Sequence, residues 1–169
     1  VLTPLFTPPL DTAVGGERPT VQLVDITLNK GEYSFNFDKL NRWIEMAERC
    51  GIRYFEFSHF FTQWGAKKAP KIMVTEDGEY KQLFGWKTKA MSRRYKAFLK
   101  AFSVELKKYI EERNLRSRVF FHVSDEPNMS MIFSYKKAAA YIRTLFEGYT
   151  VMDALSDYRF YKKGIVTNP

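Results

Sequence analysis

Residues 40–155 alternate between helical and extended patterns, and this alternation limits the possible folds more than any other feature. Apolar residues recur at helical spacing over residues 40–50, 93–113 and 130–147. Mostly apolar extended runs follow these segments at 52–58, 118–123 and 150–155. Gly51 and Gly148 stand where the first and last helices are expected to end. The order predicts an α/β fold in which parallel strands are joined by right-handed helical crossovers.

Two pairs of short extended runs predict β-hairpins inserted into this pattern. Residues 21–28 and 33–37 flank a turn at 29–31, and residues 72–75 and 79–83 flank Asp77-Gly78. The second pair lies within a long excursion over residues 59–91, and excursions of that length are uncommon unless they serve a function. Residues 1–20 are rich in Pro, Thr and Gly, which predicts an irregular N-terminal segment.

The chain length allows two architectures for residues 21–169. A (β/α)₈ TIM-type barrel takes about 250 residues and eight strand–helix units, whereas this chain has 169 residues. We therefore expect either a partial (β/α)₈ barrel with parallel strands, crossover helices and hairpin insertions, or an open α/β sheet.

Composition excludes several classes of protein. Hydrophobic residues make up 45% of the chain and aromatic residues 17%, so it is not intrinsically disordered. The formal net charge of +8 comes from dispersed lysines and arginines, without an RNA-binding signature or zinc-finger spacing, so no nucleic-acid partner is expected. There is no apolar run long enough to span a membrane, and the single cysteine, Cys50, cannot form an internal disulfide.

Polar residues follow each of the predicted parallel strands. His59 comes after residues 52–58, Asp125 and Glu126 after 118–123, and Asp157 after 150–155. Ligands of parallel α/β folds bind beyond the carboxyl ends of the strands, so these side chains are expected at one edge of the sheet.

The adjacent carboxylates Asp125 and Glu126 are the main catalytic candidates. Glycosidic cleavage needs an acid for the leaving oxygen and a group that stabilises positive charge at the anomeric carbon. The side chains of neighbouring residues diverge too much to lie on opposite sides of one glycosidic bond. They suit substrate-assisted cleavage, in which one carboxylate orients a 2-acetamido group of the substrate and the other is the acid. The alternative is structural, because Asp-Glu-Pro also favours the start of a helix.

The remaining candidates would bind substrate. His59 is suited to hydrogen-bond a hydroxyl or acetamido group, Trp64 and Trp86 could stack on a sugar ring, and Asp157 could bind a hydroxyl. Each has a packing or capping alternative. His122 lies within a predicted strand and is expected in the core. Two histidines without spaced partners predict no metal site, and no cofactor motif is present.

Three segments resemble glycoside hydrolase family 123, which includes β-N-acetylgalactosaminidases. They are residues 54–61, Trp64-Gly65-Ala66 and above all residues 120–127, which end in Ser124-Asp125-Glu126-Pro127. The resemblance implies a (β/α)₈ catalytic barrel and retaining, substrate-assisted hydrolysis. It also implies that Asp125 holds the acetamido group and that Glu126 is the acid and later the base. His59 and Trp64 fall in matching segments.

The expected function is therefore removal of a terminal β-linked N-acetylhexosamine from a glycan or glycoconjugate. N-acetylgalactosamine is the first candidate for that sugar. A secreted or periplasmic location in a bacterium fits this activity, and the sequence specifies no oligomeric state. Two alternatives stay open: a carbohydrate-binding or scaffold protein that keeps the fold without catalysis, and a basic nucleic-acid-binding domain, which only the charge and the aromatic residues favour.

Overall fold

The alternation of strands and helices builds a parallel sheet, as predicted. In the computed structural model, which describes residues 1–10, 13, 15–16 and 18–169, this sheet has the order β1-β4-β7-β8, and every neighbouring pair is parallel. Its strands are β1 (Leu2–Thr3), β4 (Phe55–Phe57), β7 (Val119–Phe121) and β8 (Thr150–Val151). The strands of this sheet lie side by side in the order in which they occur in the chain.

One long helix lies in each connection between these strands. They are α1 (Asp38–Arg49), α2 (Arg93–Glu112) and α3 (Ile132–Leu145), with short 3₁₀ turns at Arg116–Arg118 (η1) and Met129–Met131 (η2). Ser92 is the N-cap of helix α2, and its side chain accepts a hydrogen bond from the Tyr95 N–H. A four-residue helix, α4 (Arg159–Lys162), follows β8. Among the described residues, no helix has the length and apolar character needed to cross a membrane.

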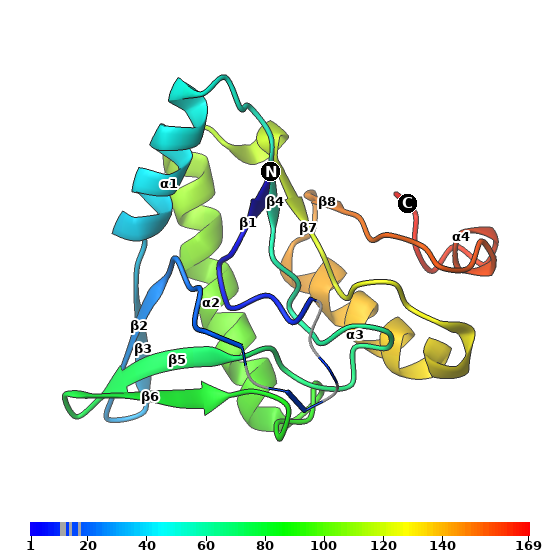
Figure 1. Cartoon of the computed structure of the whole chain (residues 1–169), viewed down its shortest axis with the longest axis horizontal. Helices are drawn as coiled ribbons and strands as arrows, with labels where there is room; N and C mark the ends of the chain where they lie inside the picture. Colours follow the sequence, from blue (N-terminus) through cyan, green and yellow to red (C-terminus); the bar gives the residue numbers. More distant parts are fainter. Residues whose placement is uncertain (11–12, 14, 17) are drawn as a thin grey trace.

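Both predicted hairpins form, and they join into a second sheet. Strands β2 (Asp25–Asn29) and β3 (Glu32–Asn36) make the first hairpin, and β5 (Ile72–Glu76) and β6 (Glu79–Phe84) make the second. Strands β2 and β5 pair in parallel, which gives the order β3-β2-β5-β6. We refer to this as the hairpin sheet; Figure 1 shows it below α1, beside α2.

Helix α2 connects the two sheets through an aromatic core. The Phe98 ring lies against Phe6 at 5.7 Å, Tyr33 at 5.2 Å and Phe84 at 5.1 Å between centroids. The Tyr95 hydroxyl donates to the Phe60 carbonyl oxygen at 2.6 Å, just beyond β4. The chain that leaves β4 is thereby fixed against a buried helix.

Two predictions about local structure need correction. Residues 1–20 were expected to be irregular, but Leu2–Thr3 form β1 and Leu5 and Phe6 are fully buried in the core; residues 11, 12, 14 and 17 lie outside the described part. The parallel strands are also shorter than predicted, since β4 ends at Phe57, β7 at Phe121 and β8 at Val151. As a result His122 and Asp153 lie beyond strand ends rather than within strands.

Candidate active site

The carboxyl ends of β4, β7 and β8 bring three loops together at one edge of the parallel sheet. The Phe61 N–H donates to the Val123 carbonyl oxygen at 3.1 Å, and the Ser124 hydroxyl donates to the Thr62 carbonyl oxygen at 2.8 Å. The Ser156 hydroxyl donates to the Pro127 carbonyl oxygen at 2.9 Å. This edge is where parallel folds bind ligands, so the predicted meeting of strand ends is confirmed in the backbone.

Residues 125–128, which we call the acid turn, are clamped by the backbone of Trp64. The Trp64 N–H donates to the Asp125 carbonyl oxygen at 2.7 Å, and the Asn128 N–H donates to the Trp64 carbonyl oxygen at 3.1 Å. The Trp64 residue is 37% exposed, so part of its indole faces solvent beside the turn. Asp125 is half-buried and Glu126 is exposed, which places the two carboxylates in different environments.

Backbone strain is concentrated in the same place. Glu126 has φ +39°, Trp64 has φ +68° and Ala66 has φ +52°. Side chains other than glycine occupy this left-handed region at a cost of roughly 1–3 kcal/mol, and such residues cluster at functional sites. Because these three residues lie in the two loops that hydrogen-bond to one another, the strain supports a functional role for the acid turn.

Asp153, which follows β8, anchors the chain directly before the acid turn. Its Oδ1 accepts the N–H groups of Val123 at 2.9 Å and Ser124 at 3.3 Å and lies 3.3 Å from His122 Nδ1. The Tyr135 hydroxyl bonds to Oδ2. Asp153 is 1% exposed; burial raises the pKa of its carboxyl group, and the hydrogen bonds act against that rise.

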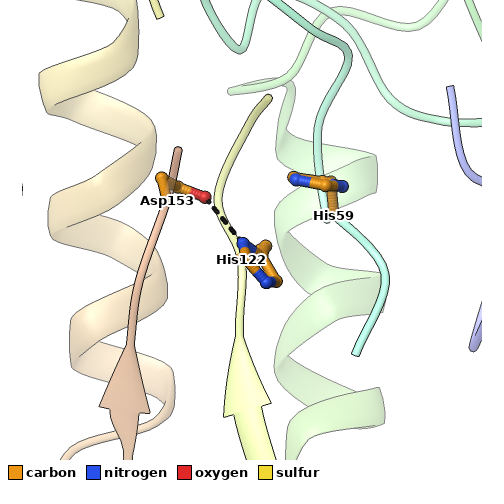
Figure 2. Close-up of side chains that lie close together, drawn as sticks. All are labelled: His59, His122 and Asp153. Atoms are coloured by element: carbon orange, nitrogen blue, oxygen red, sulfur yellow. Dashed lines mark hydrogen bonds and ion pairs between the residues drawn. The ribbon is translucent and has the colours of Figure 1, made fainter. Parts of the chain in front are cut away.

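Two buried histidines lie next to this carboxylate, as Figure 2 shows. The ring centroids of His59 and His122 are 4.7 Å apart, and the two residues are 5% and 6% exposed. Burial, followed by the nearby His122, lowers the pKa of His59 to about 3, so His59 is neutral at physiological pH. Among the described residues, Nδ1 of His59 and Nε2 of His122 have no hydrogen-bond partner, although Nε2 of His122 lies 3.7 Å from a carboxylate oxygen of Glu56. His122 is buried as predicted, but it faces polar groups.

This cluster has the residue types of a metal site, but the oxygens of its carboxylate already have partners. One ligand atom from each of His59, His122 and Asp153 lies within 4.8 Å of the other two. However, both Asp153 oxygens are already engaged, by two backbone N–H groups, His122 and Tyr135. Two imidazole nitrogens alone fall short of the three protein ligands of a typical catalytic zinc site. The donor set therefore fits a hydrogen-bonded network better than a metal ion.

The other two predicted binding residues have separate surroundings. Trp86 lines a hollow of about 530 Å³ at the end of β6, which neither Asp125 nor Glu126 lines. The Asp157 carboxylate is held by the Arg159 guanidinium and backbone N–H, which lower its pKa to about 2. Roles for Trp86 and Asp157 in substrate binding stay predictions.

Asp153 is the residue at this edge that sequence reasoning missed. It was counted within the strand predicted over 150–155, whereas β8 ends at Val151. The sequence did carry a signal, because Asp153 lies between apolar residues in a segment predicted to be a strand. An aspartate that is fully buried in such a segment is almost always paired. Its partners, His122 and Tyr135, are distant in the chain, so the sequence does not identify them.

Comparison with known proteins shows the family to which the chain belongs. The family profile described as glycoside hydrolase 123, catalytic domain, matches residues 1–169. No curated protein sequence matches the chain. A solved family 123 glycoside hydrolase from Clostridium perfringens, studied for the details of glycolipid glycan hydrolysis, is similar with a TM-score of 0.65 and 11% identity. The match covers 96% of this chain and 29% of that chain, and at this identity it establishes a shared fold alone.

Proposed function

The chain belongs to the family of glycoside hydrolase 123 catalytic domains, and from this premise we propose that it removes a terminal β-linked N-acetylhexosamine, specifically N-acetylgalactosamine, from a glycan. The observation that carries the proposal is the strained acid turn at the carboxyl end of β7, which presents consecutive carboxylates. The glycolipid glycan cleaved by the clostridial enzyme is a substrate of the same chemical class.

The proposed mechanism uses the substrate's own amide as the nucleophile. Consecutive residues direct their side chains apart, so Asp125 and Glu126 are poorly placed to flank one glycosidic bond. The carbonyl oxygen of a 2-acetamido group can instead attack the anomeric carbon to form an oxazolinium intermediate, and water then opens that intermediate with retained configuration. An internal nucleophile reacts with an effective molarity of about 10⁵ M or more when it is well oriented.

Each carboxylate has one task in this scheme. Asp125, which is half-buried, orients and polarises the acetamido group. Glu126, which is exposed, protonates the leaving oxygen and later takes a proton from the attacking water. The partly exposed Trp64 would contact the sugar from the loop after β4, whereas His59 in the same loop is 5% exposed.

We also propose that the parallel sheet is part of a (β/α)₈ barrel. Four parallel strands lie in chain order, and a helix lies in each connection between them. A barrel requires this order, whereas doubly wound sheets reverse direction at a switch point. The helix-facing residues Phe57 and Phe121 are fully buried, while Glu56 and Phe120 on the opposite face are partly exposed. In a closed barrel, that second face would line the interior.

Hydrolysis of 4-nitrophenyl N-acetyl-β-galactosaminide by the full chain tests the function. We expect Glu126→Gln and Asp125→Asn each to lower kcat/KM by about 10²-fold or more, while Glu79→Gln at the start of β6 in the hairpin sheet leaves it unchanged. 4-Nitrophenyl β-galactoside, which lacks the acetamido nucleophile, should not be cleaved. Activity that survives both acid-turn substitutions would refute the assignment.

A non-catalytic, carbohydrate-binding role is the second candidate. This role needs the fold and a surface on which a sugar ring can stack, such as the partly exposed Trp64, but no catalytic acid. Binding of N-acetylgalactosamine in calorimetry, without release of nitrophenol from the substrate above, would select this alternative. Cleavage that depends on Glu126 would exclude it.

A further inference from the structure

Asp153 lies at the centre of the hydrogen-bond network behind the acid turn. It is 1% exposed, and its partners come from the chain after β7 and from α3 (Figure 2 shows its bond to His122). Burying a carboxylate is costly unless its charge is hydrogen-bonded or paired. A residue that only filled this space could be apolar, so its polar contacts indicate what it does.

The contacts of Oδ1 fall on the two residues that precede Asp125. The N–H groups of Val123 and Ser124 both point to this one oxygen, at 2.9 and 3.3 Å. Each is a buried backbone donor, and a buried donor without an acceptor costs roughly 1–3 kcal/mol. The direction in which the chain enters the acid turn is therefore determined by the carboxylate.

The contacts with His122 and Tyr135 fix Asp153 itself. Nδ1 of His122 lies 3.3 Å from Oδ1, and the Tyr135 hydroxyl bonds to Oδ2. Tyr135 is 1% exposed, and its ring packs edge-on against Phe160 with centroids 5.4 Å apart. Because α3 packs in the core, the carboxylate is held against a rigid element rather than a loop.

We propose that Asp153 is a positioning residue that holds the acid turn in its strained conformation through the Val123 and Ser124 N–H groups. Glu126 at φ +39° persists only if the surrounding structure holds it there. The turn itself is held by the Trp64 backbone at Asp125 and Asn128. The Ser156 hydroxyl holds it at Pro127. Asp153 supplies the upstream anchor. The inference rests on the proposed function, since the turn it positions carries the proposed acid.

The test compares two replacements of similar size. Asp153→Asn keeps a carbonyl oxygen for the two N–H groups, whereas Asp153→Leu fills the space and accepts nothing. We expect the Asn variant to retain kcat within about threefold. The Leu variant should lose kcat by about 10- to 100-fold, with KM nearly unchanged, because misplacing a catalytic group by about 1 Å has an effect of this size. Asp25→Asn, on the surface of the hairpin sheet, is the control.

Amide hydrogen exchange of the free protein separates this proposal from the function itself. In the Leu variant, exchange at Val123 and Ser124 should be at least about 10-fold faster, while amides of β5 keep their wild-type rates. If the Leu variant does not fold, Tyr135→Phe removes one donor to Asp153, and exchange at both amides should rise as kcat falls.

The two proposals fail in different ways. Faster exchange at Val123 and Ser124 with unchanged kcat would overturn the positioning role and leave the enzyme assignment intact. Unchanged exchange in the Leu variant would overturn the positioning role as well. Absence of hydrolysis by the wild-type chain would refute the function, while the exchange data would still show whether Asp153 anchors the turn.

Discussion

The two sheets of this protein differ in where they place strained residues. In the hairpin sheet, the left-handed residues Lys30 and Asp77 each precede a glycine in a tight turn, and the turn geometry requires that conformation. At the carboxyl edge of the parallel sheet, Trp64, Ala66 and Glu126 are left-handed although none of them lies in a hairpin turn. The left-handed residues of the hairpin turns serve a connection, whereas those beside the acid turn mark a candidate site.

The sheets also differ in how they place charge. The ion pairs made by the hairpin sheet are open to solvent: Asp25 of β2 pairs with Lys39 of α1 at 2.6 Å, and Glu76 of β5 pairs with Lys81 of β6 at 2.8 Å. At the edge of the parallel sheet, Asp153 and the two histidines are buried. Exposed pairs add little stability, while buried polar groups must be satisfied. The same kind of substitution should therefore have unequal effects in the two sheets.

The largest effect should come from the buried carboxylate. Asp153→Ala leaves the donors of Val123, Ser124 and Tyr135 without an acceptor, and we expect the free energy of unfolding to fall by about 3 kcal/mol or more. Asp25→Ala removes an exposed partner of Lys39 and should cost about 1 kcal/mol or less. Urea denaturation of both variants measures the difference, and equal losses would contradict the contrast between the sheets.

A pH-dependent effect of intermediate size should come from His59. Burial lowers its pKa from 6.5 to about 3 in the folded protein. Between these pH values the unfolded chain binds a proton that the folded protein does not. Stability is therefore lost as the pH falls from about 6.5 towards 3, by at most about 1.4 kcal/mol per pH unit from this residue.

His59→Phe isolates that contribution. The variant should lose stability less steeply than the wild type in denaturation curves recorded at pH 7, 5.5 and 4.5. The two proteins differ at this one residue, so the difference between their curves reports the contribution of His59. Parallel loss of stability in the two proteins would show that His59 titrates normally.

The smallest effect should come from a hairpin turn. Lys30 has φ +49°, and Asn tolerates that region better than Lys, so Lys30→Asn should raise the free energy of unfolding by about 0.5 kcal/mol. Lys30→Gln removes the same charge without relieving the strain and should be neutral. Hydrolysis should be unchanged in both variants; altered hydrolysis would mean that the hairpin sheet contributes to the site.

Sequence reasoning succeeded where the signal is local. The spacing of Phe98, Phe102 and Leu106 identified α2, and the turn residues Asp77-Gly78 identified the second hairpin. The alternation of helices and strands identified the parallel order of β4, β7 and β8. Each of these signals lies within one helical repeat, one turn or one crossover unit.

The features that were missed depend on pairing between distant residues. Strand β1 has two residues, too few for a pattern, and is defined by its pairing with β4. The parallel pairing of β2 with β5 joins insertions that have no sequence signal for one another. The acid turn was predicted because its two carboxylates are adjacent in the chain, whereas the proposed role of Asp153 follows from contacts with α3 and with the chain after β7.

The pairing of β2 with β5 has a consequence for how this domain can change in evolution. The two hairpins belong to different crossovers, yet each covers an edge of the other through the contacts of Thr27 with Thr75 and Leu28 with Glu76. Deleting one hairpin would leave an uncovered strand on its partner, and such strands invite aggregation. Relatives of this protein should therefore carry both hairpins or neither, although α1 and β4 separate them in the chain.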